Sequence, residues 1–252
     1  MISIVIAAYN EEKRIGVSLQ KIAAHFAKSG EAYEVIVVDD GSADRTSDVV
    51  QSLSSEMPCI KVIRYSVNRG KGYALRQGVM AAAGDVILLT DADLSTPIEE
   101  LSRLLPEITD HGYGIVIGSR ALEASEIIRK QPWWRQGMGK IFNKLVKFIA
   151  LDEFSDTQCG FKIFSGNIAK TLFKDAIIDR FAFDVEILMR ARMMGFRVLE
   201  APVKWVNSPG SKVNPVSDSM RMLYDLLKIR WSLGRTGKIQ PPEIIRNYNS
   251  TK

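Results

Sequence analysis

The chain has 252 residues, of which 46% are hydrophobic and 25% charged, and its formal net charge is +5. This composition is ordinary for a globular protein with a sizeable core, and the length allows one large domain or a domain with an elaborated C-terminal part. Two cysteines provide no disulfide framework and fit a reducing compartment, and the two histidines lie away from the acidic motifs, which argues against a histidine-built zinc site.

Predicted strands and helices alternate along the first half of the chain. Apolar and β-branched runs predict strands at 2–8, 34–38, 60–65, 85–90 and 114–118. Helical periodicity predicts helices between them at 14–29, 46–54, 73–83 and 98–110. Two further short strands, 161–164 and 197–203, are expected to extend the sheet. The alternation indicates an α/β fold with a parallel sheet.

The most informative motif is Asp91-Ala92-Asp93, which follows a buried-type strand and precedes a predicted helix. The two carboxylates are therefore expected at the ligand-binding edge of an open α/β sheet. Acids one residue apart repel each other unless a cation lies between them, and Mg²⁺ or Mn²⁺ suits such oxygen ligands and also bridges phosphates. By itself the motif is equally consistent with a loop aspartate and a helix-capping aspartate.

Two other predicted strands also end in polar residues, Tyr9-Asn10-Glu11-Glu12 and Asp39-Asp40-Gly41-Ser42. The first group can stack on and hydrogen-bond a base and ribose, and the two aspartates can accept hydrogen bonds from a base imino group or ribose hydroxyls. The alternative is structural: the aspartates cap the helix that starts near residue 46, and the asparagine makes a turn. Three polar strand ends favour a single shared site.

The loop Asn68-Arg69-Gly70-Lys71-Gly72 combines two glycines with two cations, so that its backbone N–H groups and Lys71 can approach a phosphate. It follows the third strand and lacks the third glycine of a dinucleotide fingerprint, which argues against an NAD enzyme. Arg120 and Arg135 are candidates for bidentate contacts to a second phosphate. For Arg135 a solvated helix face is an equal alternative.

Two basic amphipathic segments occupy the C-terminal half. Residues 127–151 hold six basic and no acidic residues, interleaved with apolar side chains at helical spacing. Residues 219–238 hold five basic residues and one acid, and five of their apolar residues are expected on one helical face: Met220, Leu223, Tyr224, Leu227 and Trp231. No stretch of about 18 uninterrupted apolar residues occurs, so no transmembrane helix is expected.

Taken together, these motifs resemble the inverting, metal-dependent nucleotide-sugar glycosyltransferases of family 2, and the resemblance covers almost the whole chain. Its generic markers are the four motifs around residues 9–11, 38–42, 68–72 and 91–93. The more specific markers are Gly118-Ser119-Arg120, Asp156-Thr157-Gln158-Cys159-Gly160-Phe161-Lys162, Phe181-Ala182-Phe183-Asp184-Val185-Glu186 and Gly210-Ser211-Lys212. These look like the dolichyl-phosphate β-glucosyltransferase branch, with the dolichol-phosphate mannosyltransferases as close relatives.

The resemblance implies a GT-A (Rossmann-like) fold, with a mostly parallel sheet flanked by helices in a domain at 1–215 and a C-terminal amphipathic helix and tail at 216–252. It implies a nucleotide-sugar site formed by Ala7, Tyr9, Glu11, Asp39, Asp40, Lys71, Asp91 and Ala92. Asp93 would bind Mg²⁺ or Mn²⁺ with help from Ser95, and Asp91 would lie near the sugar or ribose. Arg120 and Arg135 would hold the acceptor phosphate, completing a catalytic set with Asp91 and Asp93.

The implied reaction moves a hexose, favoured as glucose from UDP-glucose, onto a polyprenyl or dolichyl phosphate. Two departures from the family pattern are Ala7, where proline is usual, and Ser95, where the mannosyl branch often has glutamine. The second weakens the alternative of a GDP-mannose-dependent mannosyltransferase. A sugar nucleotidyltransferase is a further alternative, but it would usually carry a glycine-rich basic loop after the first strand.

For such an enzyme the basic segments indicate helices that lie on the membrane surface, and we expect a cytoplasmic protein bound peripherally to the cytoplasmic face of a membrane. The alternative is that their apolar faces pack on the core or in a dimer interface. For residues 219–238 the sequence favours neither this alternative nor membrane binding. A nucleic-acid-binding module would also use basic stretches, but it leaves the acidic strand ends unexplained, so no nucleic-acid partner is expected.

Overall fold

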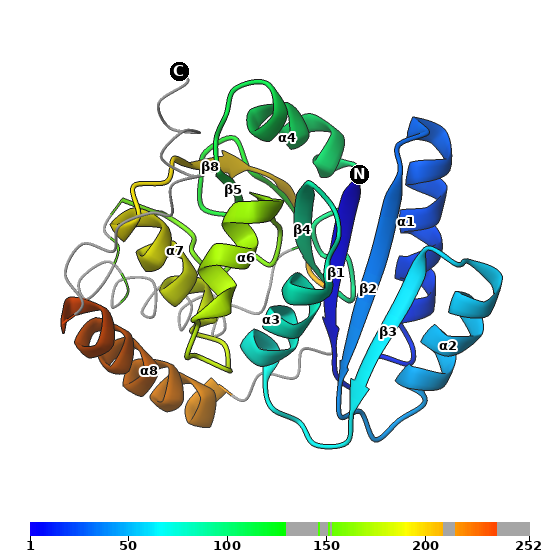
Figure 1. The fold of residues 1–252 in the computed structure, drawn as a ribbon, viewed down its shortest axis with the longest axis horizontal. Helices are drawn as coiled ribbons and strands as arrows, with labels where there is room; N and C mark the ends of the chain where they lie inside the picture. Colours follow the sequence, from blue (N-terminus) through cyan, green and yellow to red (C-terminus); the bar gives the residue numbers. More distant parts are fainter. Residues whose placement is uncertain (130–145, 147–150, 152, 209–214, 236–252) are drawn as a thin grey trace.

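The computed structural model describes residues 1–129, 146, 151, 153–208 and 215–235. Its main sheet has seven strands in the order β3-β2-β1-β4-β7-β5-β8 (Figure 1). Their bounds are β1 Ile2–Ala8, β2 Tyr33–Asp40, β3 Ile60–Tyr65, β4 Val86–Asp91, β5 Ile115–Ser119, β7 Lys162–Ser165 and β8 Val198–Pro202. β7 runs antiparallel to its neighbours β4 and β5, and the other pairs are parallel. The mostly parallel α/β sheet is as expected from the sequence.

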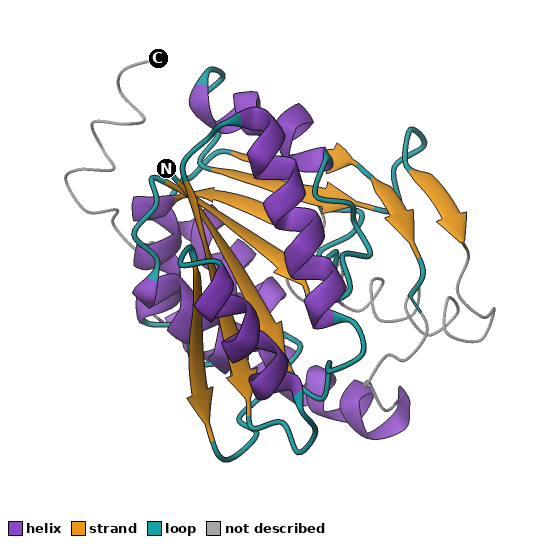
Figure 2. Cartoon of the chain, turned by 90° about the vertical axis from the view of Figure 1, so that its right-hand side faces the viewer, coloured by secondary structure: helices purple, strands orange, loops and turns teal. Residues whose placement is uncertain are grey.

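Helices cover both faces of this sheet (Figure 2). The helices are α1 Ile15–Ser29, α2 Thr46–Glu56, α3 Lys71–Ala81, α4 Glu100–Thr109, α6 Gly166–Lys174, α7 Phe183–Met193 and α8 Pro215–Arg235. Neighbouring residues of β1 show why the strands are apolar throughout. Ile4 packs in a cluster with α1 and α4, whereas Val5 packs in a cluster with α3, α6, α7 and α8. Strands buried on both faces need apolar side chains in both directions.

The predicted order of the first nine elements is confirmed, with shifts at their ends. The largest that bears on the site concerns α3, which begins at Lys71 and not at Tyr73. Lys71 and Gly72 therefore lie in the first turn of a helix, and the prediction that they belong to a loop is wrong. The short parallel pair of β6 Glu126–Arg129 and β9 Lys204–Val206 was not predicted.

Helix α8 has two apolar stripes on opposite sides. The inner stripe, Met222, Leu226, Ile229 and Leu233, is buried in the main core. The outer stripe, Met220, Tyr224, Leu227 and Trp231, is between 55% and 69% exposed. The face selected from the sequence is thus not the one that packs on the core. No helix among the described residues is long and apolar enough to cross a bilayer.

The start of α7 is fixed by a buried carboxylate, Glu186. It accepts hydrogen bonds from the backbone N–H groups of Ile177 and Ile178 at 2.8–3.0 Å, and it pairs with Arg190 at 2.8 Å. Because Glu186 is fully buried, these partners replace the water that the carboxylate loses on folding. The loop before α7 is therefore anchored to the helix.

We predict that Glu186→Ala lowers the free energy of unfolding by about 3–5 kcal/mol, because it leaves a buried guanidinium without its partner. The matched control is Glu153→Ala, since Glu153 pairs with Arg192 at 3.3 Å on the surface and should contribute about 0–1 kcal/mol. Urea denaturation followed by circular dichroism measures both. Equal losses in the two variants would contradict the anchoring role.

Candidate active site

The carboxyl ends of β1, β2 and β4 meet at one edge of the sheet. In the strand register Ala8 of β1 pairs with Asp39 of β2, and Ala7 pairs with Asp91 of β4. Parallel strands point their ends in the same direction, so the polar residues that follow β1 lie between the two acidic strand ends. Tyr9, the first of them, is 37% exposed at the rim.

Asn10 connects the loops that follow β1 and β2. Its backbone is left-handed, with φ of 55°, a conformation that asparagine tolerates better than most residues. Its N–H donates to Ser42 Oγ at 2.9 Å, and its Oδ1 accepts from Ala43 N at 2.8 Å. These contacts are those of a turn residue, which is the structural role considered for Asn10 from the sequence.

Asp39 and Asp40 have different surroundings. Asp40 accepts hydrogen bonds from Asn68 Nδ2, Arg69 N and Gly70 N at 2.8–2.9 Å, and so holds the loop before α3. Asp39 is fully buried, and its Oδ1 accepts a hydrogen bond from Ser42 N. Neither aspartate caps α2, because Thr46 N donates to Asp44 instead.

The second carboxylate oxygen of Asp39 keeps its capacity to accept a hydrogen bond. Asp39 Oδ2 is buried, has no hydrogen-bond partner among the residues that the structure describes, and lies 3.4 Å from Arg64 Nε. A buried acceptor without a donor costs free energy, so a ligand N–H that reaches it is favoured. Asp39 Oδ2 is therefore a candidate contact for an N–H group of a nucleotide base.

Lys71 and Asp91 form an ion pair of 2.6 Å across the site. Burial alone lowers the pKa of Lys71, but the carboxylates of Asp91 and Asp184 outweigh it and raise that pKa above its ordinary value. Burial raises the pKa of Asp91, but Lys71 outweighs it and the pKa ends below the ordinary value. Both groups are therefore charged at neutral pH.

The glycines around this pair are required by close packing. A Cβ on Gly70 or Gly72 would lie 2.4–2.5 Å from the carbonyl oxygens of Asp179 and Ile178. A Cβ on Gly160 would lie 2.1 Å from Asp91 Oδ2. Gly70 and Gly72 thus have a packing role against the segment before α7, in addition to the phosphate approach predicted from the sequence.

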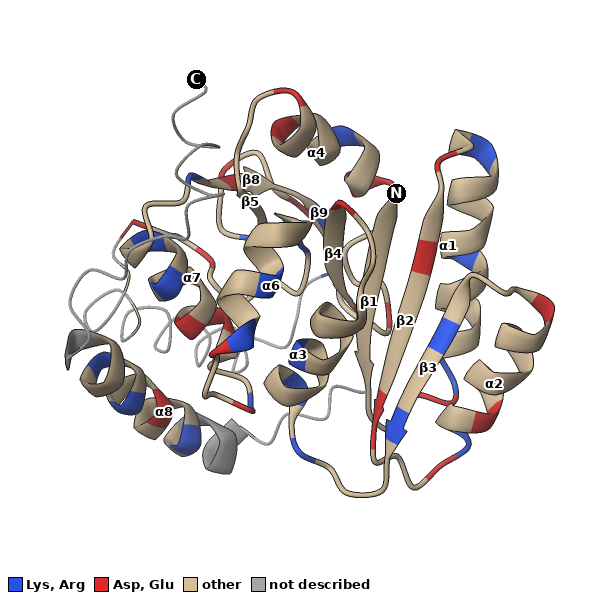
Figure 3. Ribbon diagram, viewed as in Figure 1, with Lys and Arg blue, Asp and Glu red and all other residues tan. Residues whose placement is uncertain are grey.

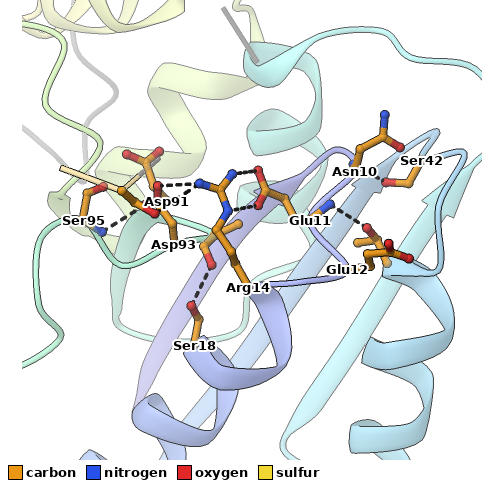
Figure 4. A network of polar contacts seen from close by, with 12 residues as sticks. Asn10, Glu11, Glu12, Arg14, Ser18, Ser42, Asp91, Asp93 and Ser95 are labelled. Carbon is orange, nitrogen blue, oxygen red and sulfur yellow. Dashed lines mark hydrogen bonds and ion pairs between the residues drawn. The ribbon is translucent and has the colours of Figure 1, made fainter. Parts of the chain in front are cut away.

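Asp93 lies beside the residues that follow β1, as Figure 4 shows. Its Oδ1 accepts from Ser95 N at 3.0 Å, and its Oδ2 lies 3.3 Å from Arg14 Nη1. Arg14 also binds both carboxylate oxygens of Glu11 at 2.6 Å. Arg14 was not among the predicted site residues, because nothing in its spacing shows that its side chain reaches from the start of α1 to the β4 loop.

Ala92 and Ser95, also predicted at the site, are largely buried. The Ala92 side chain packs in the core, and its carbonyl accepts from Ser18 Oγ at 2.7 Å. The Ser95 carbonyl accepts from Val206 N at 2.7 Å, which joins the loop to β9. A bound ligand could thus contact Ala92 through its backbone but not through its buried side chain.

Arg120 and the motif 156–162 form a second buried set of charges next to Asp91. Arg120 makes a bidentate pair with Asp156 at 2.6 and 2.8 Å, and Lys162 pairs with Asp184 at 2.5 Å. Burial raises the pKa of Asp184, and Lys162 and Lys71 counteract that shift only in part. Arg120 and Lys162 both contribute to the lowered pKa of Asp91, so the two sets are electrostatically one site. Arg135 lies outside the described residues.

Asp91 and Asp93 fit a hard divalent cation that shares its coordination with a substrate. Their side chains are 36% and 16% exposed, so carboxylate oxygens of both reach the solvent side. The described residues contain no cluster of three or more His, Cys, Asp or Glu arranged as metal ligands. Mg²⁺ is commonly held by one or two carboxylates together with phosphate oxygens and water, and this pair offers that set.

A protein-family model described as "Glycosyl transferase family 2" matches residues 3–173. The chain is 36% identical to the dolichyl-phosphate beta-glucosyltransferase of Homo sapiens, over 94% of this chain and 79% of that one. It is 33% identical to the enzyme of the same name from Dictyostelium discoideum, over 91% of this chain and 74% of that one.

Solved structures show the same fold at lower identity. Glucosyl-3-phosphoglycerate synthase from Mycobacterium tuberculosis, in complex with Mn²⁺, UDP-glucose and phosphoglyceric acid, has a TM-score of 0.69 at 18% identity and covers 96% of this chain and 81% of its own. A mannosyltransferase from Pyrobaculum calidifontis, with GDP-mannose and Mn²⁺, has a TM-score of 0.61 at 20% identity and covers 96% of this chain and 66% of its own. The expected GT-A fold is confirmed.

The Arg120–Asp156 pair predicts a pH dependence of stability. Burial raises the pKa of Asp156, but Arg120 outweighs it and the pKa lies below the ordinary value of about 3.9. A lowered carboxyl pKa stabilises the fold above that ordinary value, and the contribution is lost as the pH falls through the folded-state pKa. Asp156→Asn should therefore cost about 2 kcal/mol at pH 7 and progressively less from pH 5 to pH 3.

Denaturation curves at pH 7, 5, 4 and 3 measure this difference. The control is Asp85→Asn, because the Asp85 side chain is 88% exposed and, within the part of the chain that the structure describes, pairs only with the N-terminal amine. A wild-type advantage over Asp156→Asn that stays constant down to pH 3 would rule out the linkage.

Proposed function

Because the chain belongs to glycosyl transferase family 2, we propose that it transfers glucose from UDP-glucose to a dolichyl or polyprenyl phosphate, with inversion at the anomeric carbon. The observation that carries the proposal is the meeting of Lys71, Asp91 and Asp93 at one sheet edge, in a chain similar over most of its length to dolichyl-phosphate beta-glucosyltransferases. The enzyme is thus a hexosyltransferase.

The base of the donor is proposed to contact Asp39. Uracil offers one imide N–H between two carbonyl groups, and Asp39 Oδ2 supplies an acceptor with the Arg64 guanidinium 3.4 Å away as a donor. Tyr9 and Glu11, which follow β1, are proposed to contact the base and ribose. This arrangement supports a uridine nucleotide.

The leaving diphosphate is proposed to lie between Lys71 and Asp93. Lys71 is charged and sits in the first turn of α3, where the helix N-terminus also favours an anion. When bound by Asp93, with Asp91 and Ser95 near, Mg²⁺ or Mn²⁺ supplies further positive charge for the departing diphosphate. The contribution of the chain itself is positioning and charge stabilisation.

The acceptor needs no dedicated base. A phosphate monoester has a second pKa of about 6 and is already anionic at neutral pH, so its oxygen can attack the anomeric carbon directly. Arg120, held in place by Asp156 and 30% exposed, is proposed to orient that phosphate. Arg135 is proposed as its second contact.

Helix α8 is proposed to hold the enzyme at the cytoplasmic face of a membrane. Its outer stripe of Met220, Tyr224, Leu227 and Trp231 is exposed, and the basic residues Arg221, Lys228 and Arg230 are exposed on the same helix. Figure 3 shows Lys and Arg positions in blue along α8. Apolar side chains flanked by cations suit an interfacial helix, and each basic residue near an anionic surface adds roughly 1 kcal/mol.

We predict that Asp93→Ala lowers glucosyl transfer at least about 100-fold, because the developing charge on the diphosphate loses its metal-linked partner. Transfer of labelled glucose to dolichyl phosphate measures it, with the exposed Asp48→Ala as the control that keeps wild-type activity. Wild-type activity of Asp93→Ala in the presence of a chelator would refute the metal role.

A donor panel tests the choice of substrate. UDP-glucose, UDP-galactose and GDP-mannose are compared with Mn²⁺ and with Mg²⁺, and with and without dolichyl phosphate. We expect turnover with UDP-glucose to exceed the others at least about tenfold, since one extra well-placed hydrogen bond has about that effect. Preferential use of GDP-mannose would assign the enzyme to the mannosyl branch instead.

We predict that the double variant Tyr224→Ser/Leu227→Ser binds vesicles with anionic lipid at least about tenfold more weakly than the wild type, because two side chains lose apolar burial. Vesicle flotation measures it. Val17→Ser on α1, 55% exposed, is the control for a general loss of surface hydrophobicity. A wild-type protein that stays wholly in the soluble fraction would count against the interfacial role.

A further inference from the structure

Each carboxylate of the Asp91-Ala92-Asp93 motif already has a cationic partner from the protein. Lys71 Nζ lies 2.6 Å from Asp91 Oδ1, and Arg14 Nη1 lies 3.3 Å from Asp93 Oδ2. A pair of carboxylates one residue apart would repel each other if left alone. Here the repulsion is offset by Lys71 and Arg14 without any added ion.

Arg14 is held in this position from more than one side. Glu11 binds it through both carboxylate oxygens at 2.6 Å, and Ser208 Oγ accepts from Nη1 at 3.3 Å. Its side chain is 21% exposed, and those of Glu11 and Asp93 are 11% and 16% exposed. Bidentate geometry makes the guanidinium a fixed charge, and Figure 4 shows it between the two carboxylates.

A divalent cation that approaches Asp93 therefore meets a fixed positive charge. It must either displace the guanidinium from Asp93 or share the carboxylate with it, and like charges in a partly buried site repel strongly. An anionic diphosphate changes this balance, since its negative charges interact favourably with the cation, with Arg14 and with Lys71 together.

We propose that Arg14 is a positioning residue that occupies Asp93 in the donor-free protein, so that the divalent cation binds tightly only together with the diphosphate of the donor. This inference rests on the proposed function, because it takes Asp93 as the metal ligand and a nucleotide diphosphate as the partner. The role depends on the charge of Arg14, and the same contact keeps Asp93 turned toward the donor site.

The test measures Mn²⁺ binding to the full chain from the electron paramagnetic resonance signal of free Mn²⁺, with and without UDP. For the wild type, UDP should tighten Mn²⁺ binding at least about 30-fold, within the usual range of coupling between two ligands. Arg14→Gln should bind Mn²⁺ without UDP about tenfold more tightly than the wild type, and its gain from UDP should shrink about tenfold.

Two further variants separate charge from structure. Lys13→Gln removes a neighbouring exposed cation outside the network and should behave as the wild type. Arg14→Lys keeps the positive charge without the bidentate contact and should retain most of the coupling to UDP. Far-UV circular dichroism and the Tm show whether each variant is folded. If Arg14→Gln does not fold, the Mn²⁺ binding of Arg14→Lys is compared with that of the wild type instead.

The inference is overturned if donor-free Mn²⁺ binding is no tighter in Arg14→Gln than in the wild type, if the wild type binds Mn²⁺ equally well with and without UDP, or if folded Arg14→Lys has lost the coupling. These results leave the proposed transfer reaction intact. Absence of Mn²⁺ binding to the wild type even with UDP would overturn both this inference and the metal part of the proposed function.

Discussion

The active site depends on the pairing of β1 with β2 on one side and β4 on the other. This register places Asp39 and Asp91 beside the last residues of β1, so three segments far apart in the sequence end together. Since all three strands are parallel and buried on both faces, a shift of one strand would also move its core side chains. The packing of the sheet therefore fixes the spacing of the polar groups.

Charge pairing then sets the chemistry of this edge. Three cations, Lys71, Arg120 and Lys162, face three carboxylates, Asp91, Asp156 and Asp184. Buried ion pairs contribute little net stability, because desolvation offsets their attraction. Their value here is orientation, because the ion pairs hold charged groups from separate strands, helices and loops close together at this edge of the sheet. The motif 156–162 supplies two of the six charges and the glycine that Asp91 packs against.

The sequence predicts the strands, their order along the chain and their polar ends, because apolar runs and the residues that follow them are local patterns. It does not predict the contacts of Arg14 and Lys162 or the different roles of Asp39 and Asp40, because these follow from which groups the fold brings together in space. Helix α8 illustrates the same limit. A period of 3.6 residues fits both stripes of the helix, and only packing against the core decides which one is inside.

One backbone segment, residues 177–179, links the proposed membrane helix to the proposed donor site. Lys228 of α8 donates to the carbonyl of Ile177 at 3.5 Å, and the N–H groups of Ile177 and Ile178 are held by Glu186. The next carbonyl, of Asp179, accepts from Tyr73 N at 3.0 Å in the first turn of α3, where Lys71 lies. This segment therefore connects α8 to the lysine proposed to contact the diphosphate. If the outer stripe rests on the lipid surface, the same segment sets the depth at which a lipid phosphate meets the donor, and the acceptor need not leave the membrane to react.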